Sequence, residues 1–178
     1  MQDFIIGTYF VSLTILFLFG SSGFVMIYYY MKHRNKTPHR PSPLATFPVV
    51  TIQLPLYNEF YVIERLIDAT CEIDYPRDRL EIQVLDDSTD ETVDVVAAGV
   101  EHYRRLGFDI KQIRRTNRSG FKAGALKEGL ADAKGEFIAI FDADFVLNKD
   151  FLMQTLPYFH MDPAIGLVQT RWEHLNSN

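Results

Sequence analysis

A long apolar run near the amino terminus constrains this chain more than any other feature. Residues 4–31 form 28 consecutive positions without a charged side chain. A helix of about 20 apolar residues spans the hydrocarbon core of a bilayer, so the run is long enough to cross one. It is too long for the apolar core of a cleaved signal peptide, and the start Met1-Gln2-Asp3 lacks the basic residues of such a peptide. We therefore predict one transmembrane helix over residues 4–31, with a buried core helix as the alternative.

Basic residues are concentrated on one side of the apolar run. Lys32, Arg34, Lys36 and Arg40 come directly after it, whereas a single acidic residue precedes it. Because basic residues favour the cytoplasmic side of a membrane helix, the rest of the chain is predicted to be cytoplasmic, at the inner or plasma membrane if the source is bacterial. Residues 32–48 contain four prolines as well as these basic residues, which predicts an extended linker.

The remaining residues, 49–178, are enough for one domain. Apolar residues make up 47% of the chain, which allows a substantial core. The net charge of −5 argues against a nucleic-acid binder that relies on a basic surface. The single cysteine, Cys71, rules out an internal disulfide and is expected to be a small core residue.

Beyond the linker, strand patterns and helix patterns alternate. Runs of β-branched and apolar residues predict strands, and apolar residues at helical spacing predict helices. The expected strands are residues 49–54, 80–85, 110–113, 137–141 and 165–169, and the expected helices are residues 59–73, 92–106, 123–133 and 150–159. This alternation predicts an α/β fold with a mostly parallel sheet, whose strand-to-helix loops share one edge.

Polar clusters follow four of the expected strands, at the edge where open α/β sheets bind ligands. Carboxylates alone would repel one another there, but carboxylates with a divalent cation and a basic loop make a diphosphate site. Mg²⁺ takes one or two carboxylates plus substrate phosphates, so Asp142 and Asp144 are candidate metal ligands, and Arg118 and Lys122 are candidate phosphate contacts. The clusters are Tyr57-Asn58-Glu59, Asp86-Asp87-Ser88-Thr89-Asp90, Arg114 to Lys122, and Asp142-Ala143-Asp144.

Each cluster also has a purely structural interpretation. Asp90 or Ser88 fits the N-cap of the following helix. The pairs Asn58-Glu59, Asp86-Asp87 and Asp142/Asp144 fit caps or turns, because Asp and Asn bond readily to nearby backbone. The basic loop also has a structural interpretation, because its arginines fit a face exposed to solvent. These are Arg114, Arg115 and Arg118.

At these residues the chain resembles the family 2 glycosyltransferases, and among them the cellulose-synthase-like enzymes that build glucan and mannan backbones. The resemblance implies a GT-A, Rossmann-like nucleotide-sugar-binding domain over residues 49–178, incomplete at its carboxyl end. It rests on five segments in the family's order and spacing: Gln53 to Glu59, Gln83 to Asp90, Gly120 to Leu126, Ile140 to Phe145 and Leu167 to Trp172.

The resemblance implies a role for each matching residue. Tyr57 and Glu59 would border the nucleoside, and Asp87, with Asp86 as a second candidate, would hydrogen-bond the base. Lys122 would lie near the base or the diphosphate. Asp144 would bind a Mg²⁺ or Mn²⁺ ion on the diphosphate, with Asp142 beside it, facing the ribose or the sugar. The donor would be UDP-glucose or GDP-mannose, the acceptor a growing β-linked glycan, and the transfer inverting.

The sequence departs from the family pattern after Trp172. The Thr-Glu-Asp-like motif that carries the general base does not follow it, and neither does the Gln-x-x-Arg-Trp motif of the acceptor end. We therefore expect an amino-terminal fragment that is inactive alone, and a non-catalytic nucleotide-sugar-binding module is the alternative function.

Two other enzyme classes are weaker alternatives. Asp142-Ala143-Asp144-Phe145-Val146 fits the Asp-x-Asp-x-Thr/Val motif of haloacid-dehalogenase-like phosphatases, but that motif normally opens its domain. The Gly-x-Gly-x-x-Gly of a dinucleotide enzyme and the P-loop motif are both absent from the sequence.

Overall fold

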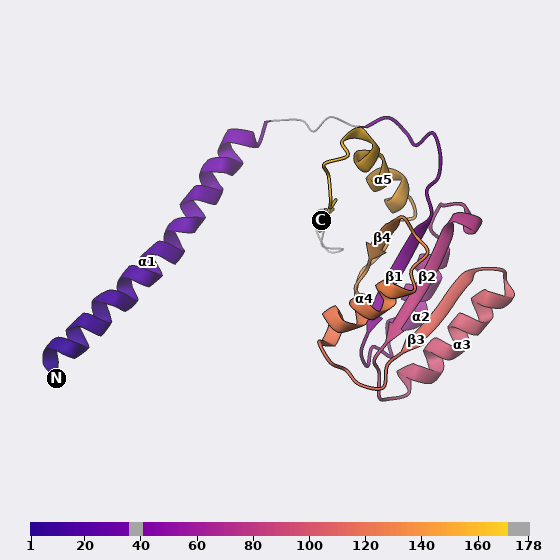
Figure 1. The fold of residues 1–178 in the computed structure, drawn as a ribbon, viewed down its shortest axis with the longest axis horizontal. Helices are drawn as coiled ribbons and strands as arrows, with labels where there is room; N and C mark the ends of the chain where they lie inside the picture. Colours follow the sequence, from indigo (N-terminus) through magenta and orange to yellow (C-terminus); the bar gives the residue numbers. More distant parts are fainter. Residues whose placement is uncertain (36–40, 171–178) are drawn as a thin grey trace. The chain divides into compact units, whose positions relative to one another are not determined.

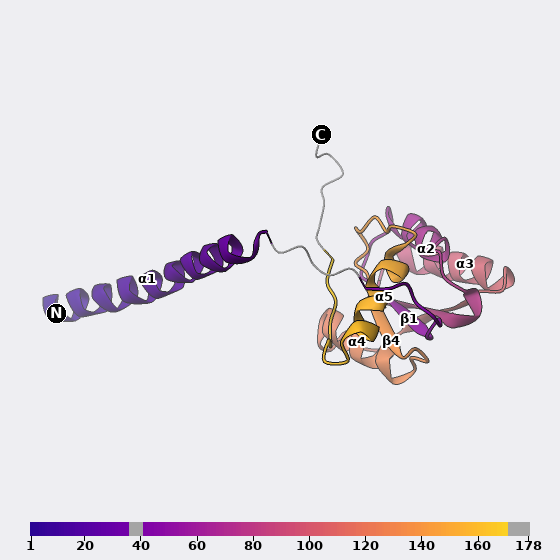
Figure 2. The ribbon, with the colours of Figure 1, turned by 90° about the horizontal axis from the view of Figure 1, so that it is seen from above.

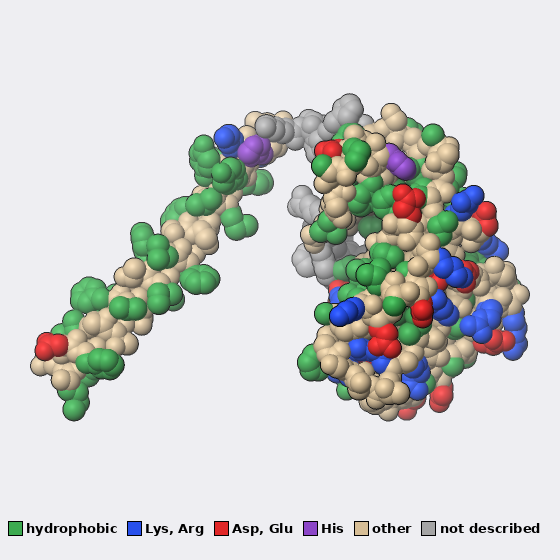
Figure 3. Space-filling view, in the orientation of Figure 1, with side chains coloured by type: hydrophobic (Ala, Val, Ile, Leu, Met, Phe, Trp, Pro, Cys, Tyr) green, Lys and Arg blue, Asp and Glu red, His purple; other side chains and the backbone are tan. Residues whose placement is uncertain are grey.

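The computed structural model describes residues 1–35 and 41–170. The chain divides into two compact units, residues 1–40 and residues 41–178. In the first unit, α1 (Gln2–His33) is one continuous helix of 32 residues, which confirms the expected helix. Its apolar side chains are exposed along its length (Figure 3), with Asp3 in the first turn and Lys32 and His33 in the last. Within the described part of the chain it is the one helix long and apolar enough to cross a membrane, and an 18-residue stretch of it has a mean hydropathy of 2.1.

The second unit is a four-stranded parallel sheet covered by helices (Figure 1). The strand order is β3-β2-β1-β4, so β1 lies between β2 and β4. Val50 aligns with Leu80 on one side and with Phe137 on the other. The elements of this unit are β1 (Val50–Leu56), α2 (Ile63–Cys71), the 3-10 helix η1 (Arg77–Arg79), β2 (Leu80–Asp86), α3 (Thr92–Arg105), β3 (Asp109–Arg114), α4 (Phe121–Ala131), β4 (Phe137–Ile140) and α5 (Phe151–Met161).

One face of the sheet carries the apolar core. Successive side chains of a strand point to opposite faces, so every second residue of β1 and β2 lies on this side. These residues cluster with buried residues of α2, α3 and α5. The two sides of the sheet are visible in Figure 2, with α2 and α3 on one side and α4 on the other. The central members of the cluster are Val50, Ile52, Leu54, Ile82 and Val84.

The other face, covered by α4, is polar although it is buried. Thr51, Gln53, Glu81 and Gln83 are each no more than 1% exposed. Thr51 donates to Glu81 over 2.6 Å, and Gln53 donates to Gln83 over 3.0 Å. Such pairs offset part of the cost of burying polar groups, because a hydrogen bond replaces one lost to water, although the Gln83 side-chain nitrogen stays without a partner. Helix α4 therefore rests on hydrogen-bonded side chains together with the apolar Leu85.

The structure confirms four of the five expected strands and shifts some boundaries. The strand expected over residues 165–169 is wrong, because these residues are irregular and join no ladder. The helix expected from Glu59 begins at Ile63, after a turn. Cys71 is buried as expected, and burial raises the pKa of its thiol to about 12.

Candidate functional site

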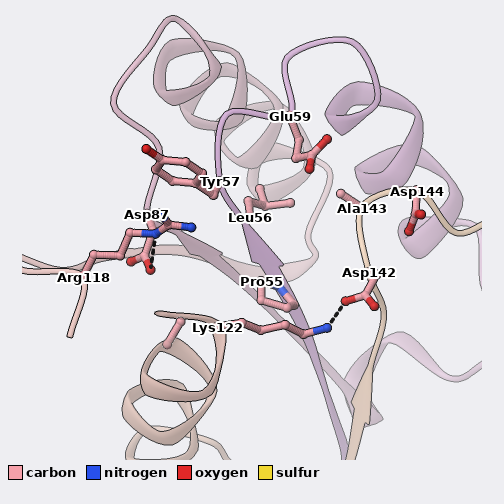
Figure 4. A pocket seen from close by; sticks show the side chains of 11 residues that line it. Pro55, Leu56, Tyr57, Glu59, Asp87, Arg118, Lys122, Asp142, Ala143 and Asp144 are labelled. Atoms are coloured by element: carbon pink, nitrogen blue, oxygen red, sulfur yellow. Dashed lines mark hydrogen bonds and ion pairs between the residues drawn. The ribbon is translucent and has the colours of Figure 1, made fainter. Parts of the chain in front are cut away.

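A pocket of about 510 Å³ lies at the carboxyl ends of β1, β2 and β4 (Figure 4). Seven of the eight residues predicted to form the site line this pocket, and Asp86 is the exception. The lining residues are Pro55, Leu56, Tyr57, Glu59, Asp87, Arg118, Lys122, Ala125, Asp142, Ala143 and Asp144.

The loop after β1 is fastened to the loop after β2. Asn58 adopts a left-handed conformation with φ of 56°, which asparagine tolerates better than most residues. Its N–H donates to the Ser88 hydroxyl over 2.9 Å, and its side-chain oxygen accepts from the Thr89 N–H over 2.9 Å. These bonds hold the neighbouring Tyr57 and Glu59 at the pocket.

Of the two candidate N-caps for α3, Asp90 bonds to the backbone at the start of the helix. Its carboxylate accepts from the Thr92 N–H over 3.1 Å. Ser88 instead accepts the Asn58 N–H and is 1% exposed. Asp90 therefore stabilises the start of α3, while Ser88 joins the two loops.

Asp86 braces the end of β2 instead of facing the pocket. Its carboxylate accepts from the Ser88 N–H over 2.9 Å and from the Gln112 side chain over 2.8 Å, and it is 1% exposed. Adjacent residues of a strand point to opposite sides, so Asp86 and Asp87 cannot both face the pocket. Asp86 therefore has the structural role in a turn that the sequence offered as the alternative to ligand binding.

Asp87 lies among two arginines and a tyrosine. Arg118 has its Nε 3.9 Å from the Asp87 carboxylate, and its Cζ lies 3.2 Å from the centre of the Tyr57 ring. Arg115 forms the closer ion pair, with its Nε donating to Asp87 over 2.9 Å and a second donor on the other oxygen. The hydrogen bond from Arg115 to Asp87 raises the pKa of the guanidinium, so Arg115 stays charged.

Arg115 is the residue of this site that the sequence did not single out. It was expected with its neighbours on a solvated face, yet its side chain is 6% exposed, against 50% for Arg114. Two consecutive arginines at a strand end point to opposite sides, and the sequence holds no signal for which of them is buried.

The start of α4 positions Lys122. Gly120 and Phe121 both have positive φ, 72° and 47°, so the chain turns sharply just before the lysine. Figure 4 shows Lys122 extending across the end of β1 toward Asp142. The two side chains form an ion pair.

Asp142 and Asp144 reach the pocket because the residues between and before them are buried. Phe141 and Ala143 are 2% and 7% exposed and belong to the apolar core, which leaves the alternating aspartates on the other side. Among the described residues, no group of three or more His, Cys, Asp or Glu side chains converges on a metal site. Two carboxylates fit a Mg²⁺-type ion that takes its remaining ligands from substrate phosphates and water.

Comparison with known proteins identifies the family. The model of the family described as Glycosyl transferase family 2 matches residues 51–178. The chain belongs to this family. Membership sets aside the phosphatase alternative and agrees with the parallel α/β fold of the second unit.

Several curated relatives are plant mannosyltransferases. The chain is 48% identical over 136 residues to "Probable glucomannan 4-beta-mannosyltransferase 4" of Oryza sativa subsp. japonica, covering 74% of the chain and 25% of that protein. It is 45% identical over 138 residues to "Glucomannan 4-beta-mannosyltransferase 9" of Arabidopsis thaliana, covering 75% and 26%. The chain thus spans about a quarter of the length of these relatives.

Solved structures give the same fold. The mannosyltransferase PcManGT from Pyrobaculum calidifontis, in complex with GDP-Man and Mn²⁺, is 36% identical with a TM-score of 0.68, covering 80% of this chain and 41% of that one. Residues 1–349 of S. aureus TarS, in complex with UDP-GlcNAc, are 25% identical with a TM-score of 0.56, covering 68% and 37%.

Proposed function

We propose that this chain is the donor-binding part of a membrane-anchored, inverting hexosyltransferase that extends a β-linked glycan. The pocket carries the proposal, because it brings three aspartates, a lysine and an arginine from the segments after β2, β3 and β4 to the ends of parallel strands. A diphosphate held by a divalent cation needs this combination of negative and positive groups.

Within this proposal each side of the pocket binds one part of the donor. Tyr57, Glu59 and Asp87 border the nucleoside, with the Asp87 carboxylate accepting from the base. Lys122 and Arg118 contact the phosphates. Lys122 pairs with Asp142, and a bound phosphate would offer the lysine a second anionic partner.

Asp142 and Asp144 would hold Mg²⁺ or Mn²⁺ in this proposal. Two hard oxygen ligands separated by one residue fit such an ion, and PcManGT was solved with Mn²⁺. When bound, the cation stabilises negative charge on the departing diphosphate. The chain's own contribution is to orient the donor, so that an acceptor hydroxyl can approach the anomeric carbon from the opposite side.

GDP-mannose and UDP-glucose remain the two candidate donors. The names of the plant relatives and the GDP-Man bound to PcManGT favour GDP-mannose. TarS binds UDP-GlcNAc on the same fold, so the fold itself does not choose the base. The acceptor in this proposal is the growing end of a mannan or glucan.

The membrane part of the proposal rests on α1. Its serine and threonine hydroxyls are satisfied within the helix; Thr8, Ser12 and Thr14, for example, donate to carbonyls four residues earlier. A lipid-exposed helix must satisfy its polar groups in this way, because the hydrocarbon offers no partner. The basic residues after α1 favour a cytoplasmic position for the pocket.

Titration of the full chain in nanodiscs tests the donor site. GDP, UDP and their sugars are titrated with and without Mn²⁺, and Asp144→Asn is compared with the wild type. We expect Asp144→Asn to weaken the Mn²⁺-dependent binding by about 1.5–3 kcal/mol, as for a lost charged contact. Asp78→Asn is the matched control, because the Asp78 side chain is 80% exposed on η1.

Three results separate the possible functions. Unchanged affinity of Asp144→Asn would refute the metal assignment. Donor binding without sugar transfer would favour the non-catalytic binding module for these 178 residues. Transfer of the hexose to an added β-linked oligosaccharide would establish the enzyme, and the configuration of the product would test inversion.

A further inference from the structure

Arg115 joins three segments behind the donor pocket without lining it. Its guanidinium forms a two-point ion pair with Asp87, the residue after β2, through Nε over 2.9 Å and through Nη2. Both side chains are 6% exposed, so water screens the pair little. Planar two-point pairs of this kind fix direction as well as distance.

The remaining donors of Arg115 hold the loop that leads into α4. Nη1 donates to the carbonyl of Ser119 over 2.9 Å, and Nη2 donates to the carbonyl of Phe121 over 3.0 Å. Phe121 has φ of 47°, a left-handed conformation that is unfavourable for a residue with a β-carbon. The arginine therefore stabilises an unfavourable turn directly before Lys122.

Helix α4 is in close contact with this guanidinium. A β-carbon at Gly124 would lie 2.7 Å from Arg115 Nη1 and 2.0 Å from the Ser119 carbonyl oxygen. The helix can approach so closely because this position is glycine. The contacts of Arg115 with Asp87 and with the turn before Lys122 thus determine the distance between these two sides of the pocket.

We propose that Arg115 is a positioning residue for the donor: by holding Asp87 and the turn before Lys122 at once, it fixes the separation between the group on the base and the group on the diphosphate. This inference rests on the proposed function. It needs no contact between Arg115 and the donor, and it explains why a charged side chain is buried beside a pocket that it does not line.

Lysine cannot replace this arginine, although it keeps the charge. An ammonium group is a single point with three donors, whereas the structure uses two directions on Asp87 and two on backbone carbonyls. Arg115→Lys therefore keeps the positive charge but cannot make all four of these contacts at once. This substitution separates the effect of the charge from the effect of the geometry.

The experiment is calorimetric titration of the full chain in nanodiscs with GDP and Mn²⁺. It yields the dissociation constant and the fraction of chains able to bind as separate quantities. We expect Arg115→Lys to raise the dissociation constant about tenfold to hundredfold, with the binding fraction unchanged. Arg105→Lys is the matched control, because its Nε donates to Glu101 over 2.8 Å in a pair whose side chains are 75% and 47% exposed.

Coupling to Asp87 gives a second readout. If Arg115 acts through Asp87, then adding Arg115→Lys to Asp87→Asn should weaken GDP binding much less than it does in the wild type. Fully additive losses would overturn the part of the inference that runs through Asp87.

A purely structural role predicts another result. It would lower the binding fraction and the melting temperature while leaving the dissociation constant of the folded chains unchanged, and this outcome would overturn the inference. Failure of the wild type itself to bind GDP, UDP or their sugars would instead refute the proposed function.

Should Arg115→Lys yield no folded protein, Gly124→Ala tests the same point. It keeps the Arg115 and Asp87 side chains themselves unaltered, and it forces the Ser119 carbonyl and Arg115 Nη1 away from α4. We expect weaker GDP binding with an unchanged binding fraction, and unchanged affinity would count against the inference.

Discussion

In the inner strands β1 and β2, the two faces of the sheet are both buried and differ in chemistry. Toward α2, α3 and α5, the sheet presents residues such as Ile52 and Val84, which are fully buried in an apolar cluster. Toward α4 it presents Gln53 and Gln83, which are just as inaccessible and are joined by a hydrogen bond. Neighbouring residues of one strand therefore enter two different environments.

This difference shows how the molecule separates stability from positioning. An apolar face contributes in proportion to the area that it removes from water, with little demand on direction. A hydrogen-bonded face contributes less net free energy but fixes direction, because a displaced polar group remains buried and unsatisfied. Helix α4, which begins beside Lys122, rests on the directional face.

The largest effect is expected from truncation on the apolar face. Ile52→Ala should lower the free energy of unfolding by about 2–5 kcal/mol, because the side chain is 0% exposed and leaves a cavity. Denaturation in urea measures the loss. The affinity of the folded chains for GDP and Mn²⁺ should stay the same, since Ile52 faces away from α4.

Reduced donor affinity in the Ile52→Ala protein would contradict the division between an apolar face that stabilises the fold and a polar face that positions the pocket. It would mean that the apolar face also adjusts the pocket. The matched truncation is Val84→Ala on the neighbouring strand, which is also 0% exposed and belongs to the same cluster.

Crowding the contact between α4 and the sheet should cost less stability than Ile52→Ala, but it should also weaken donor binding. At Gly129 a β-carbon would lie 2.7 Å from Leu85 and 2.8 Å from both Gln53 and Gln83. Gly129→Ala should therefore push α4 off the sheet, lower the free energy of unfolding by about 1–3 kcal/mol, and weaken donor binding.

A helix glycine on the other side of the sheet is the control for Gly129. At Gly99, on α3, the nearest atom to a β-carbon is the end of the Ile67 side chain at 3.2 Å, which can shift slightly. We expect Gly99→Ala to leave donor binding unchanged. Equal effects at the two positions would show that crowding any helix, rather than moving α4, alters the pocket.

Much of the fold could be predicted from the sequence, because runs of β-branched and apolar residues that alternate with helical patterns specify buried strands. The strand expected over residues 165–169 was wrong because a suitable pattern still needs a neighbouring strand to bond to. The helix expected from Glu59 starts later because Asn58 bonds to Ser88 and Thr89, residues 30 and 31 positions away. Such contacts between loops have no local signature.

The pocket was predictable in outline and not in detail. Residues after parallel strands meet at one edge in any fold of this class, which brought Asp87, Lys122 and Asp142 together on topology alone. Whether Asp86 or Asp87 faces the pocket, and whether Arg114 or Arg115 is buried, depends on which side each residue points to at the end of its strand. A shift of one residue reverses both assignments.

Glu81 offers the smallest and most specific test, at the amino-terminal end of the polar face. Burial alone would raise the pKa of this carboxyl, but hydrogen bonds from the Lys134 N–H, the Thr51 hydroxyl and Lys111 lower it below the ordinary glutamate value. A group with a lowered pKa stabilises the fold above its unfolded pKa, which is about 4.3, and loses that contribution as the pH falls.

Glu81→Gln should therefore cost about 1 kcal/mol of unfolding free energy at pH 7, and this difference from the wild type should shrink as the pH falls below about 4. Urea denaturation from pH 7 to pH 3 measures both trends, with Glu101→Gln on the exposed face of α3 as the control. A difference that stays constant with pH would show that shape rather than charge matters at this position.

Donor affinity at pH 7 should not change, because Glu81 aligns with Thr51 and Asp109 at the opposite end of the strands from the pocket. A change in affinity would mean that the polar face transmits displacement along its whole length, and positioning would then belong to the face rather than to Arg115 and the start of α4.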